Sequence, residues 1–388
     1  MKANFFIPKY MEIFKCIGPN CTDTCCAGWD VNIDENTFNK YETSTNKLKD
    51  LVKGKYIKNN ESNDSFNYGF MVITTDNKCP FLNSSLLCDI HGGCGEENLS
   101  ITCKRYPRVF NIIDDVYEKS GIPSCEEVCE LAFKNKNKME FIEIEEEINE
   151  ETIEIRRVID TEAFDGSDSL LQYFWDIRIC SINIMQNRDF SIEERLSLLK
   201  SFYCNLKSLK SVFDFNGIED LLDSLNQSNF DFSKFSSNHI NSSELISSKY
   251  LNDITSNKLI DSVIGNRIKD LLKDLKVNIS IYHNKTISPI LILDDIVKCN
   301  SKLEEYSYIF ENYLVNQVFK DIIPFNKGEN LIESIDTLIN LYTLVKAYLI
   351  LDYKYSNIAI SEEQIIRVIQ ALSKDTEHNR VFKDILAQ

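Results

Sequence analysis

The cysteines of this chain are concentrated in its first third. Ten of the thirteen cysteines lie there. The remaining three, Cys180, Cys204 and Cys299, lie singly in segments of helical periodicity, where cysteine usually behaves as a small buried hydrophobe. Thiols gathered this densely bind metal or form disulfides. We therefore expect the chemistry to lie before about residue 135. The ten clustered cysteines are Cys16, Cys21, Cys25, Cys26, Cys79, Cys88, Cys94, Cys103, Cys125 and Cys129.

No secretory signal is visible in the N-terminal residues. This helps to decide whether the cysteines bind metal or form disulfides, because disulfides are typical of secreted proteins. Residues 5–7 are the only apolar run before Pro8, and they are too short for the apolar core of a signal peptide. No stretch approaches the roughly eighteen apolar residues of a membrane span. We predict a cytoplasmic protein with reduced thiols, which favours metal over structural disulfides.

The charge balance narrows the choice of partners. The chain has 388 residues, with 43 basic and 60 acidic side chains and a net charge of -17. This charge repels phosphate backbones, so nucleic acid and anionic membrane surfaces are not expected as main partners. A lysine-bearing protein surface is a better match. The length suggests two or three domains, and the oligomeric state cannot be read from the sequence.

The patterning predicts a mainly α protein in three parts. Residues 1–135 form an irregular cysteine-rich metal-binding domain, 136–164 an acidic connector or edge strand, and 165–388 a larger all-α domain. Asp34 is expected to cap a first helix, and Ser191 with Glu194 forms a capping box. Residues 226–243 are predicted to form a loop. Helices are predicted at 37–51, 166–187, from 192 past 206, and at about 244–276, 299–322, 331–354 and 361–375.

The densest motif runs from Cys16 to Trp29. Gly18, Pro19 and Gly28 supply turns that can return successive thiolates to one centre. Cys25 and Cys26 are adjacent and point in different directions, so one can bind a metal while the other binds a second metal or packs. The spacing is neither the paired Cys-x-x-Cys of a zinc ribbon nor the Cys-x3-Cys-x-x-Cys of radical enzymes.

A second motif carries Cys79, Cys88, Cys94 and Cys103. His91 is the only histidine of this domain and is a possible ligand, although a lone histidine is more often a hydrogen-bonded structural residue. The motif ends in Tyr106-Pro107-Arg108. The fork of that arginine suits the carboxylate of a cofactor, and a structural salt bridge is the competing interpretation.

Together these residues resemble a known family, the flagellin lysine-N-methylases. The ordered motifs are Tyr10-x3-Phe14-x-Cys16-Ile-Gly-x-x-Cys21-x-Asp-Thr-Cys25-Cys26-x-Gly28-Trp29, then Cys79-Pro-Phe-Leu, Leu-Cys88-x-Ile-His91, Thr-Cys103-x-x-Tyr106-Pro-Arg108 and Ser124-Cys125-Glu. The resemblance extends to Leu-Gln-Tyr-Phe-Trp-Asp-Ile-Arg178 and Glu311-Asn-Tyr-Leu-Val-Asn316 in the helical part. The family belongs to a broader set of cysteine-cluster proteins described as zinc- or iron-chelating.

The resemblance implies transfer of methyl groups from S-adenosylmethionine to the ε-amines of flagellin lysines. It also implies a metal centre, an iron-sulfur cluster with zinc as the alternative. Cys94 and Cys129 look like additions to the family pattern. The cysteines that match the family, of which a subset would bind the metal, are Cys16, Cys21, Cys25, Cys26, Cys79, Cys88, Cys103 and Cys125.

Methylation of an amine by direct displacement requires a neutral nitrogen. Free lysine has a pKa near ~10.4, so the site must desolvate it or accept its proton. Asp23 and Tyr106 lie beside cysteine motifs and are candidates for that task. No Gly-x-Gly-x-Gly follows an apolar strand, so the usual doubly wound methyltransferase is not expected.

The role of the metal and the reaction class stay open at this point. The metal can stabilise an irregular domain, bind the amino and carboxylate groups of S-adenosylmethionine, or take part in redox chemistry. The stabilising role is the simplest, since direct displacement needs no metal. The alternative function is a protein that binds or handles iron or zinc without methyltransferase activity.

Overall fold

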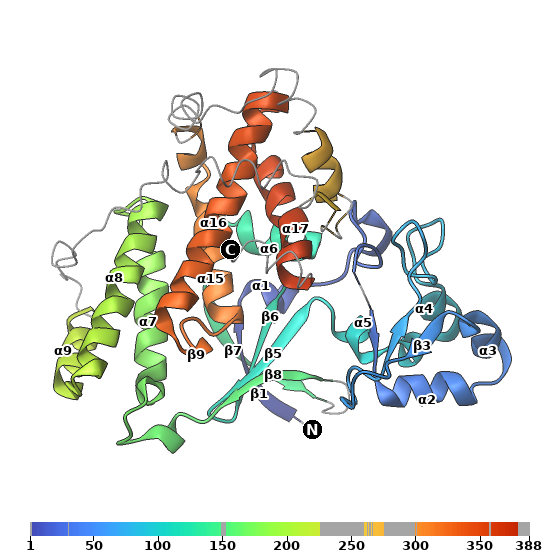
Figure 1. Ribbon diagram of the computed structural model, residues 1–388, viewed down its shortest axis with the longest axis horizontal. Helices are drawn as coiled ribbons and strands as arrows, with labels where there is room; N and C mark the ends of the chain where they lie inside the picture. The colour runs from blue at the N-terminus through green and yellow to red at the C-terminus, as the bar shows by residue number, and fades with distance from the viewer. Residues whose placement is uncertain are drawn as a thin grey trace.

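The computed structural model places the main elements of the chain (Figure 1). It describes residues 2–29, 31–148, 153–225, 260, 261, 263, 265, 267–274, 299, 301–356 and 358–378. The predicted loop at 226–243 and most of the predicted helix at 244–276 lie outside these ranges.

A five-stranded mixed sheet combines one strand at the start of the chain with four strands that lie between Arg108 and Ile159. Its order is β7-β1-β6-β5-β8, with β1 parallel to β6 and β5 parallel to β8. Phe5 and Ile7 of the first strand are buried on one face, in the alternation expected of a strand with one covered side. The strands are β1 (Lys2–Pro8), β5 (Arg108–Ile113), β6 (Val116–Gly121), β7 (Phe141–Glu147) and β8 (Ile155–Ile159).

The cysteine-rich segment lies beside this sheet and has its own small core (Figure 1). A three-stranded sheet of order β2-β4-β3 packs with short helices, and Phe38, Tyr41 and Phe81 fill the space between them. The elements between β1 and β7 are α1 (Tyr10–Ile13), η1 (Gly18–Asn20), β2 (Asn32–Ile33), α2 (Glu35–Thr43), α3 (Asn46–Val52), β3 (Tyr56–Lys58), β4 (Gly69–Met71), α4 (Asp89–Cys94), η2 (Glu96–Asn98), α5 (Ile101–Arg105) and α6 (Glu126–Phe133), besides β5 and β6.

Long helices form the rest of the described chain and lie above the five-stranded sheet (Figure 1). Helix α15 packs against β6 and against α6 and α7. These elements are η4 (Glu162–Phe164), η5 (Leu170–Tyr173), α7 (Phe174–Met185), α8 (Ile192–Ser211), α9 (Phe215–Leu225), α15 (Ser307–Lys320), β9 (Asn326–Glu329), α16 (Leu331–Leu351), the π-helical turn η7 (Asp352–Ser356) and α17 (Glu362–His378).

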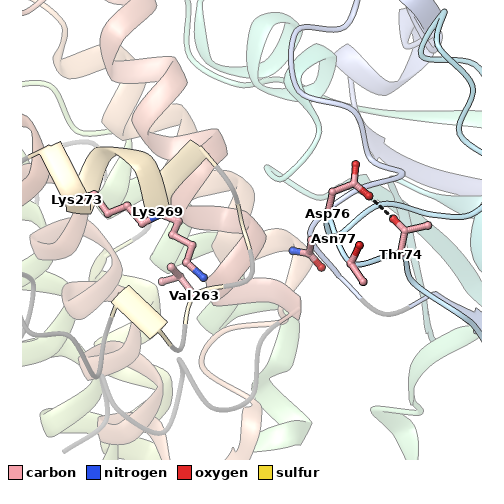
Figure 2. Close-up of a pocket in the computed structure, with 7 residues that line it drawn as sticks. Thr74, Asp76, Asn77, Val263, Lys269 and Lys273 are labelled. Atoms are coloured by element: carbon pink, nitrogen blue, oxygen red, sulfur yellow. Dashed lines mark hydrogen bonds between the residues drawn. The ribbon is translucent and has the colours of Figure 1, made fainter.

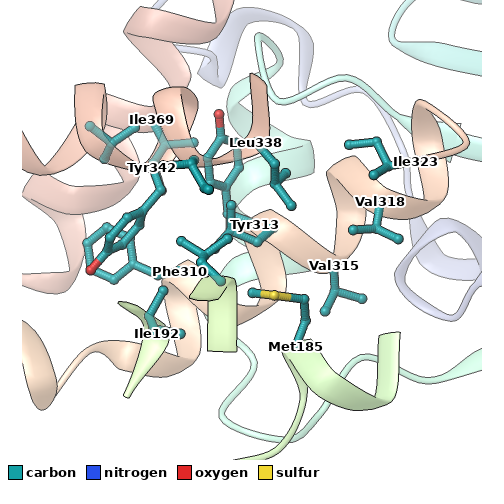
Figure 3. Close-up of a cluster of buried hydrophobic side chains, with 14 of the residues drawn as sticks. Met185, Ile192, Phe310, Tyr313, Val315, Val318, Ile323, Leu338, Tyr342 and Ile369 are labelled. Atoms are coloured by element: carbon teal, nitrogen blue, oxygen red, sulfur yellow. The ribbon is translucent and has the colours of Figure 1, made fainter. Parts of the chain in front are cut away.

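One continuous apolar core joins the sheet to these helices. It includes Phe5 and Ile7 from β1, and Figure 3 shows the part between α15 and its neighbours, where Phe310, Tyr313 and Leu338 meet. The predicted boundaries at 135 and 165 stay a prediction. Within the described residues, the side chains fall into this large core and the smaller core of the cysteine-rich segment.

The mainly α class agrees with the structure, but the expectation of an irregular N-terminal region is wrong. Two sheets order that region, and the acidic stretch after residue 140 supplies β7, which pairs along its whole length with β1. The apolar run of β1 gives little local evidence for a strand, because its pairing partners β6 and β7 lie more than 100 residues away in the sequence. Strands in such sheets are defined by those distant partners.

Apart from the helix at 244–276, which lies mostly outside the described residues, the predicted helices are found with corrected bounds. Asp34 accepts a hydrogen bond from the Thr37 amide, as predicted for a cap, but the expected single helix is divided into α2 and α3. The Ser191 and Glu194 capping box is confirmed at the start of α8. Among the isolated cysteines, Cys180 and Cys299 are buried as expected, whereas Cys204 is exposed on α8.

Helix α16 is the longest apolar element. No stretch of this kind was expected from the sequence, but Leu331–Lys354 is long and apolar enough to cross a membrane by length and composition, and 78% of its most apolar window is buried inside the protein. No other helix among the described residues meets this criterion. Its apolar side chains are thus covered by α8 and α17, which pack against it.

A buried tyrosine connects the sheet to α15. The Tyr10 hydroxyl donates to Asn316 Oδ1 at 2.7 Å and accepts from the Gly121 amide at 2.9 Å. Tyr10→Phe leaves both groups buried without this partner, so we expect a loss of about 2 kcal/mol in the free energy of unfolding, measured by urea titration. Tyr68→Phe is the control, because its hydroxyl meets only an exposed lysine. Equal stability of the two variants would contradict the prediction.

Candidate functional site

The loop from Cys16 to Trp29, here called the cysteine loop, is held from both sides by polar contacts. Glu126, at the start of α6, accepts hydrogen bonds from the Thr22 amide and hydroxyl, both at 2.8 Å. Arg267 donates to the same Thr22 hydroxyl at 2.8 Å. The loop therefore bridges the sheet region and the helical part of the chain.

Four thiols gather in the small core, and we call them thiol group one: Cys26, Cys79, Cys88 and Cys103. A backbone hydrogen bond of 2.8 Å from the Cys79 amide to the Cys26 carbonyl brings the two cysteine motifs together. Burial raises the pKa of the Cys79 and Cys103 thiols to about 12, and the neighbouring thiols of the group add to each shift. The members are thus close enough to influence one another's charge.

The other four family-matching thiols form thiol group two: Cys16, Cys21, Cys25 and Cys125. Burial raises the pKa of Cys125 to about 11, with Cys16 among the contributing charges. Burial likewise raises the pKa of Cys21 to about 12, with Cys125 and Glu126 contributing. This group lies between the cysteine loop and the start of α6.

Helix starts lie beside several of these thiols. Cys88 and Cys125 are the N-terminal capping residues of α4 and α6, and Cys103 lies in the first turn of α5. Backbone amides of the first turn lower the pKa of Cys88 and Cys125 against the dominant effect of burial. Amides directed at a sulfur favour its thiolate form, which is the form that binds metal.

Adjacent Cys25 and Cys26 link the two groups. The Cys25 thiol donates a hydrogen bond to Cys26, which lowers the pKa of Cys26 to about 7 and raises that of Cys25. Cys103 and Cys125, one from each group, also raise the pKa of the Cys25 thiol through their charges. Cys25 therefore interacts with thiols of both groups, and the binding of the two neighbours to different metals stays a prediction.

Metal-binding geometry is not formed in the part of the chain that the structure describes. There, no three His, Cys, Asp or Glu side chains converge so as to hold an ion. His91 is exposed on α4. Cys129 is buried in the large core and donates to the Pro123 carbonyl at 2.9 Å, which gives it a packing role, and Cys94 ends α4. The predicted ligand set stays a prediction.

Asp23, a predicted proton acceptor, is paired with α17. Its carboxylate lies 2.7 Å from Lys374 Nζ and accepts from Gln370 Nε2 at 2.9 Å. Gln370 also donates to the Ser124 carbonyl, and Lys374 donates to the Thr24 carbonyl. This ion-paired, hydrogen-bonded carboxylate fixes the cysteine loop against α17.

Tyr106, the second predicted proton acceptor, joins a cluster of rings. Trp29 lies between it and His378, with ring centroids 5.7 Å from Tyr106 and 4.7 Å from His378. The Tyr106 hydroxyl is 3.1 Å from Ser124 Oγ, which is 2.9 Å from His378 Nε2. Burial raises the pKa of Tyr106 well above its usual value, with Cys125 and Cys25 adding to the shift.

Arg108, the predicted cofactor contact, begins β5. Its guanidinium lies over the Phe14 ring, 5.1 Å from the centroid. Among the described residues, no carboxylate lies within ion-pair distance of it. The structure therefore supplies a cation stacked on an aromatic ring in place of the expected salt bridge.

A cavity of about 450 Å³ opens between the cysteine-rich segment and residues 263–273 (Figure 2). Lys269 and Lys273 lie on one wall, and Thr74, Asp76 and Asn77 lie on the other. Lys78 forms an ion pair with Asp76 at 2.8 Å and lowers the pKa of Asp76 to about 2, so this carboxylate is charged and already has a cationic partner. The cavity has the volume of a small-molecule site and offers opposite charges to a zwitterion.

The contribution of α17 was not foreseen from the sequence. Gln370, Lys374 and His378 are spaced by four residues, which places them on one face of the helix toward the cysteine loop. Gln370 and Lys374 are buried, at 1% and 3% exposure. Long polar residues that follow Ile366 at four-residue spacing, on an amphipathic helix, are the signal that could have identified this face.

Comparisons with known proteins give one family match and several relatives. Residues 178–388 match the family described as the FliB lysine N-methylase C-terminal domain. A lysine-N-methylase of Salmonella typhimurium is 28% identical over 121 residues, which are 31% of this chain and 30% of that protein. The flagellar biosynthetic protein FliU of Salmonella muenchen is 28% identical over 121 residues, 31% of this chain and 72% of that protein.

The extent of these matches differs. The chain spans less than a third of the length of the Salmonella typhimurium relative, at 30%, whereas the family match covers α7 from Arg178 onward and the described helices from α8 to α17. No solved structure matches the chain.

Proposed function

Because the chain belongs to the FliB lysine N-methylase family, we propose that it transfers methyl groups from S-adenosylmethionine to lysine side chains of flagellin. The observation that carries the proposal is the place of the family match in the fold. The matched residues 178–388 include α17, whose Gln370 and Lys374 hold the cysteine loop. The family segment therefore helps to build the site that the sequence motifs indicated.

Acidic surface charge supports a lysine-bearing substrate. The net charge of -17 attracts a protein that presents cationic side chains. One curated relative is named a flagellar biosynthetic protein, and flagellin fits that context. A cytoplasmic enzyme would meet flagellin before its export, so we place the reaction there.

The proposal includes a metal centre held by the thiols. Each thiol group contains four cysteines, the donor set that a single zinc ion or one iron-sulfur cluster takes. Thiol group one and thiol group two would each hold one centre, and an iron-sulfur cluster is our first choice in both. A bound metal would cross-link the cysteine loop to α4, α5 and α6 and so supply folding energy.

Two places are proposed for the carboxylate of the methyl donor. Arg108 presents a guanidinium at the start of β5, next to the cysteine loop. The polar cavity presents Lys269 and Lys273, with Asp76 opposite for the amino group. A carboxylate is well matched by either cation, and binding of S-adenosylmethionine to Arg108→Met and Lys269→Met variants would distinguish the two places.

Methyl transfer is tested directly on the substrate. Protein purified without oxygen is incubated with S-adenosylmethionine and flagellin from the same source, and the intact mass of flagellin is followed. We expect mass steps of one CH₂ unit that require both the protein and the donor. Flagellin with acetylated lysines is the control and should accept no methyl group, because its nitrogens are amides.

A metal-handling protein is the second candidate, and the gathering of eight thiols favours it. The two functions differ in how firmly the metal is held, since a carrier must release its cargo. An unchanged flagellin mass with folded, metal-loaded protein would reject the methyltransferase. Rapid transfer of that metal to a competing chelator would then support metal handling.

A further inference from the structure

One edge of the five-stranded sheet is open along the whole of strand β7. This strand is the first in the order β7-β1-β6-β5-β8, so it pairs with β1 on one side and, in the described part of the chain, with no strand on the other. Its residues Phe141–Glu147 pair with β1 without a bulge. A regular edge strand of this kind offers unpaired N–H and C=O groups to a further extended chain.

The register decides which backbone groups of β7 point to the open edge. The Lys9 amide donates to the Glu140 carbonyl at 2.8 Å, and these two residues lie opposite one another when the β1–β7 register is continued by one position. In an antiparallel pair, residues that bond to the partner strand alternate with residues that direct both N–H and C=O away from it. Phe141, Glu143 and Glu145 therefore direct their backbone groups outward.

The same outward-facing positions carry acidic side chains. Glu143, Glu145 and Glu147 are exposed and lie on one face of the strand. Glu145 pairs with the exposed Lys2, whereas Glu143 and Glu147 form no ion pair with any described residue. In an added antiparallel strand, the residue opposite each of these positions has its Cα atom about 5.5 Å away and its side chain on the same face. A cation at every second position would therefore meet a glutamate each time.

We propose that the open edge of β7 docks an extended, lysine-bearing segment of the substrate protein by strand addition; the identity of this segment rests on the proposed function. Backbone hydrogen bonds to Phe141, Glu143 and Glu145 hold the segment. Lysines at alternate positions of the segment face the row of glutamates. Main-chain bonds thus give affinity, and the row of charges selects lysine-bearing sequences.

The edge is connected to the candidate site at one end. Beside Phe141, β1 continues past Lys9 into α1 and then into the cysteine loop. Helix α6 starts after Cys125 of thiol group two and ends shortly before β7 begins. A segment docked along β7 therefore extends toward the end of the strand from which both neighbouring chain segments lead to the thiols.

Charge favours this occupant over the alternatives. A second copy of β7 would place glutamates opposite glutamates, and like charges directly opposite one another destabilise a pair of strands. The other edge strand, β8, carries Arg156 and Arg157, which repel a lysine-bearing segment. Charges on an edge strand also protect a sheet against edge-to-edge pairing, and the tests below separate that protective role from docking.

The first test addresses the backbone bonds. A fluorescent peptide of alternating lysine and threonine, equal in length to β7, is titrated with the full chain and followed by anisotropy. Glu145→Pro should weaken binding at least about tenfold, because proline removes an outward N–H and its ring blocks the edge while the bonds to β1 remain. Glu145→Gln is the matched control, since it removes the same charge, keeps the N–H and should cost less than about fourfold. The same peptide with N-methylated lysine amides should bind wild-type protein at least about tenfold more weakly.

The second test addresses the row of charges. Glu143→Gln/Glu147→Gln should weaken peptide binding about fivefold and raise KM for flagellin methylation by a similar factor, with kcat nearly unchanged. A docking contact away from the reacting atoms stabilises the bound substrate and the transition state equally. Asp220→Asn/Asp223→Asn is the matched control, because it removes two exposed charges from α9 and should change binding less than about twofold.

The outcomes separate the docking surface from the proposed function. Binding by folded Glu145→Pro within about twofold of wild type, or unweakened binding of the N-methylated peptide, rejects strand addition, and flagellin methylation by the same protein then upholds the proposed function alone. Equal losses in the β7 and α9 charge variants also reject the docking surface, because they indicate unspecific attraction. If wild-type protein adds no methyl group but binds the peptide as expected, the proposed function fails and the docking surface stands. Urea unfolding monitors the fold of each variant, and the N-methylated peptide decides if Glu145→Pro does not fold.

Discussion

Replacing Cys26 with serine is expected to remove about half of the bound metal and to destabilise the cysteine-rich segment. Serine has no thiolate, so thiol group one would lose one of its four donors, whereas thiol group two would keep all of its own. Cys26 is chosen because a hydrogen bond from Cys25 lowers its pKa to about 7, and its carbonyl accepts from the Cys79 amide. The same change therefore affects both the donor set and the junction of the two motifs.

Metal content per protein and thermal unfolding are the measurements. Cys125→Ser should give the reciprocal result, with loss at thiol group two and retention at thiol group one. Cys204→Ser is the matched control, because that thiol is exposed on α8 and belongs to neither group. Full metal content in folded Cys26→Ser would remove this residue from the ligand set. Complete loss from either single variant would indicate one shared centre in place of two.

Helix starts are predictable from the sequence because their signals are local. Asp34 with Thr37, and Ser191 with Glu194, each lie within four residues, and both caps form as expected. The division into α2 and α3 was not predicted. Ser44 and Thr45 have extended backbone conformations there, and hydroxyl side chains compete for backbone hydrogen bonds in such positions.

The five-stranded sheet was harder to predict because some of its strands pair with segments far away in the sequence. Strand β1 lies between β7 and β6 in the five-stranded sheet, and both partners follow it by more than 100 residues. The acidic stretch that contains β7 was predicted to be a connector or an edge strand, and the structure confirms an edge strand. Pairing with β1 and ion pairs such as Lys119 with Glu146 stabilise it, and neither can be read from a local window.

The candidate site shows the same division between local and distant information. Its cysteine motifs are visible in the sequence because their members are close together. The partner groups on α17 are not visible, since Gln370 and Asp23 are separated by 347 positions. The family match over 178–388 and the cysteine motifs thus describe two halves of one site, which the fold brings together along α17.

The sheet is joined to the helices by a buried ion pair whose loss should have the largest effect on stability. Arg178 of α7 donates to both carboxylate oxygens of Glu118 of β6, at 2.5 and 3.0 Å, and the two side chains are 3% and 1% exposed. Arg178 also donates to the Phe319 carbonyl and covers the Phe319 ring. Arg178→Met leaves the Glu118 carboxylate buried without its cation, so we expect a loss of about 3–5 kcal/mol in the free energy of unfolding.

Urea unfolding of single and double variants tests this prediction. Arg178→Met/Glu118→Leu removes both charges and should recover much of the loss, because the penalty lies in the unpaired charge and an apolar pair of similar volume can replace an ion pair. Lys2→Met is the control, since its pair with Glu145 is exposed and should contribute less than about 1 kcal/mol. A double variant less stable than Arg178→Met would show that the Glu118 charge is not the cause. The stability of the interface would then come from the contacts of Arg178 with Phe319.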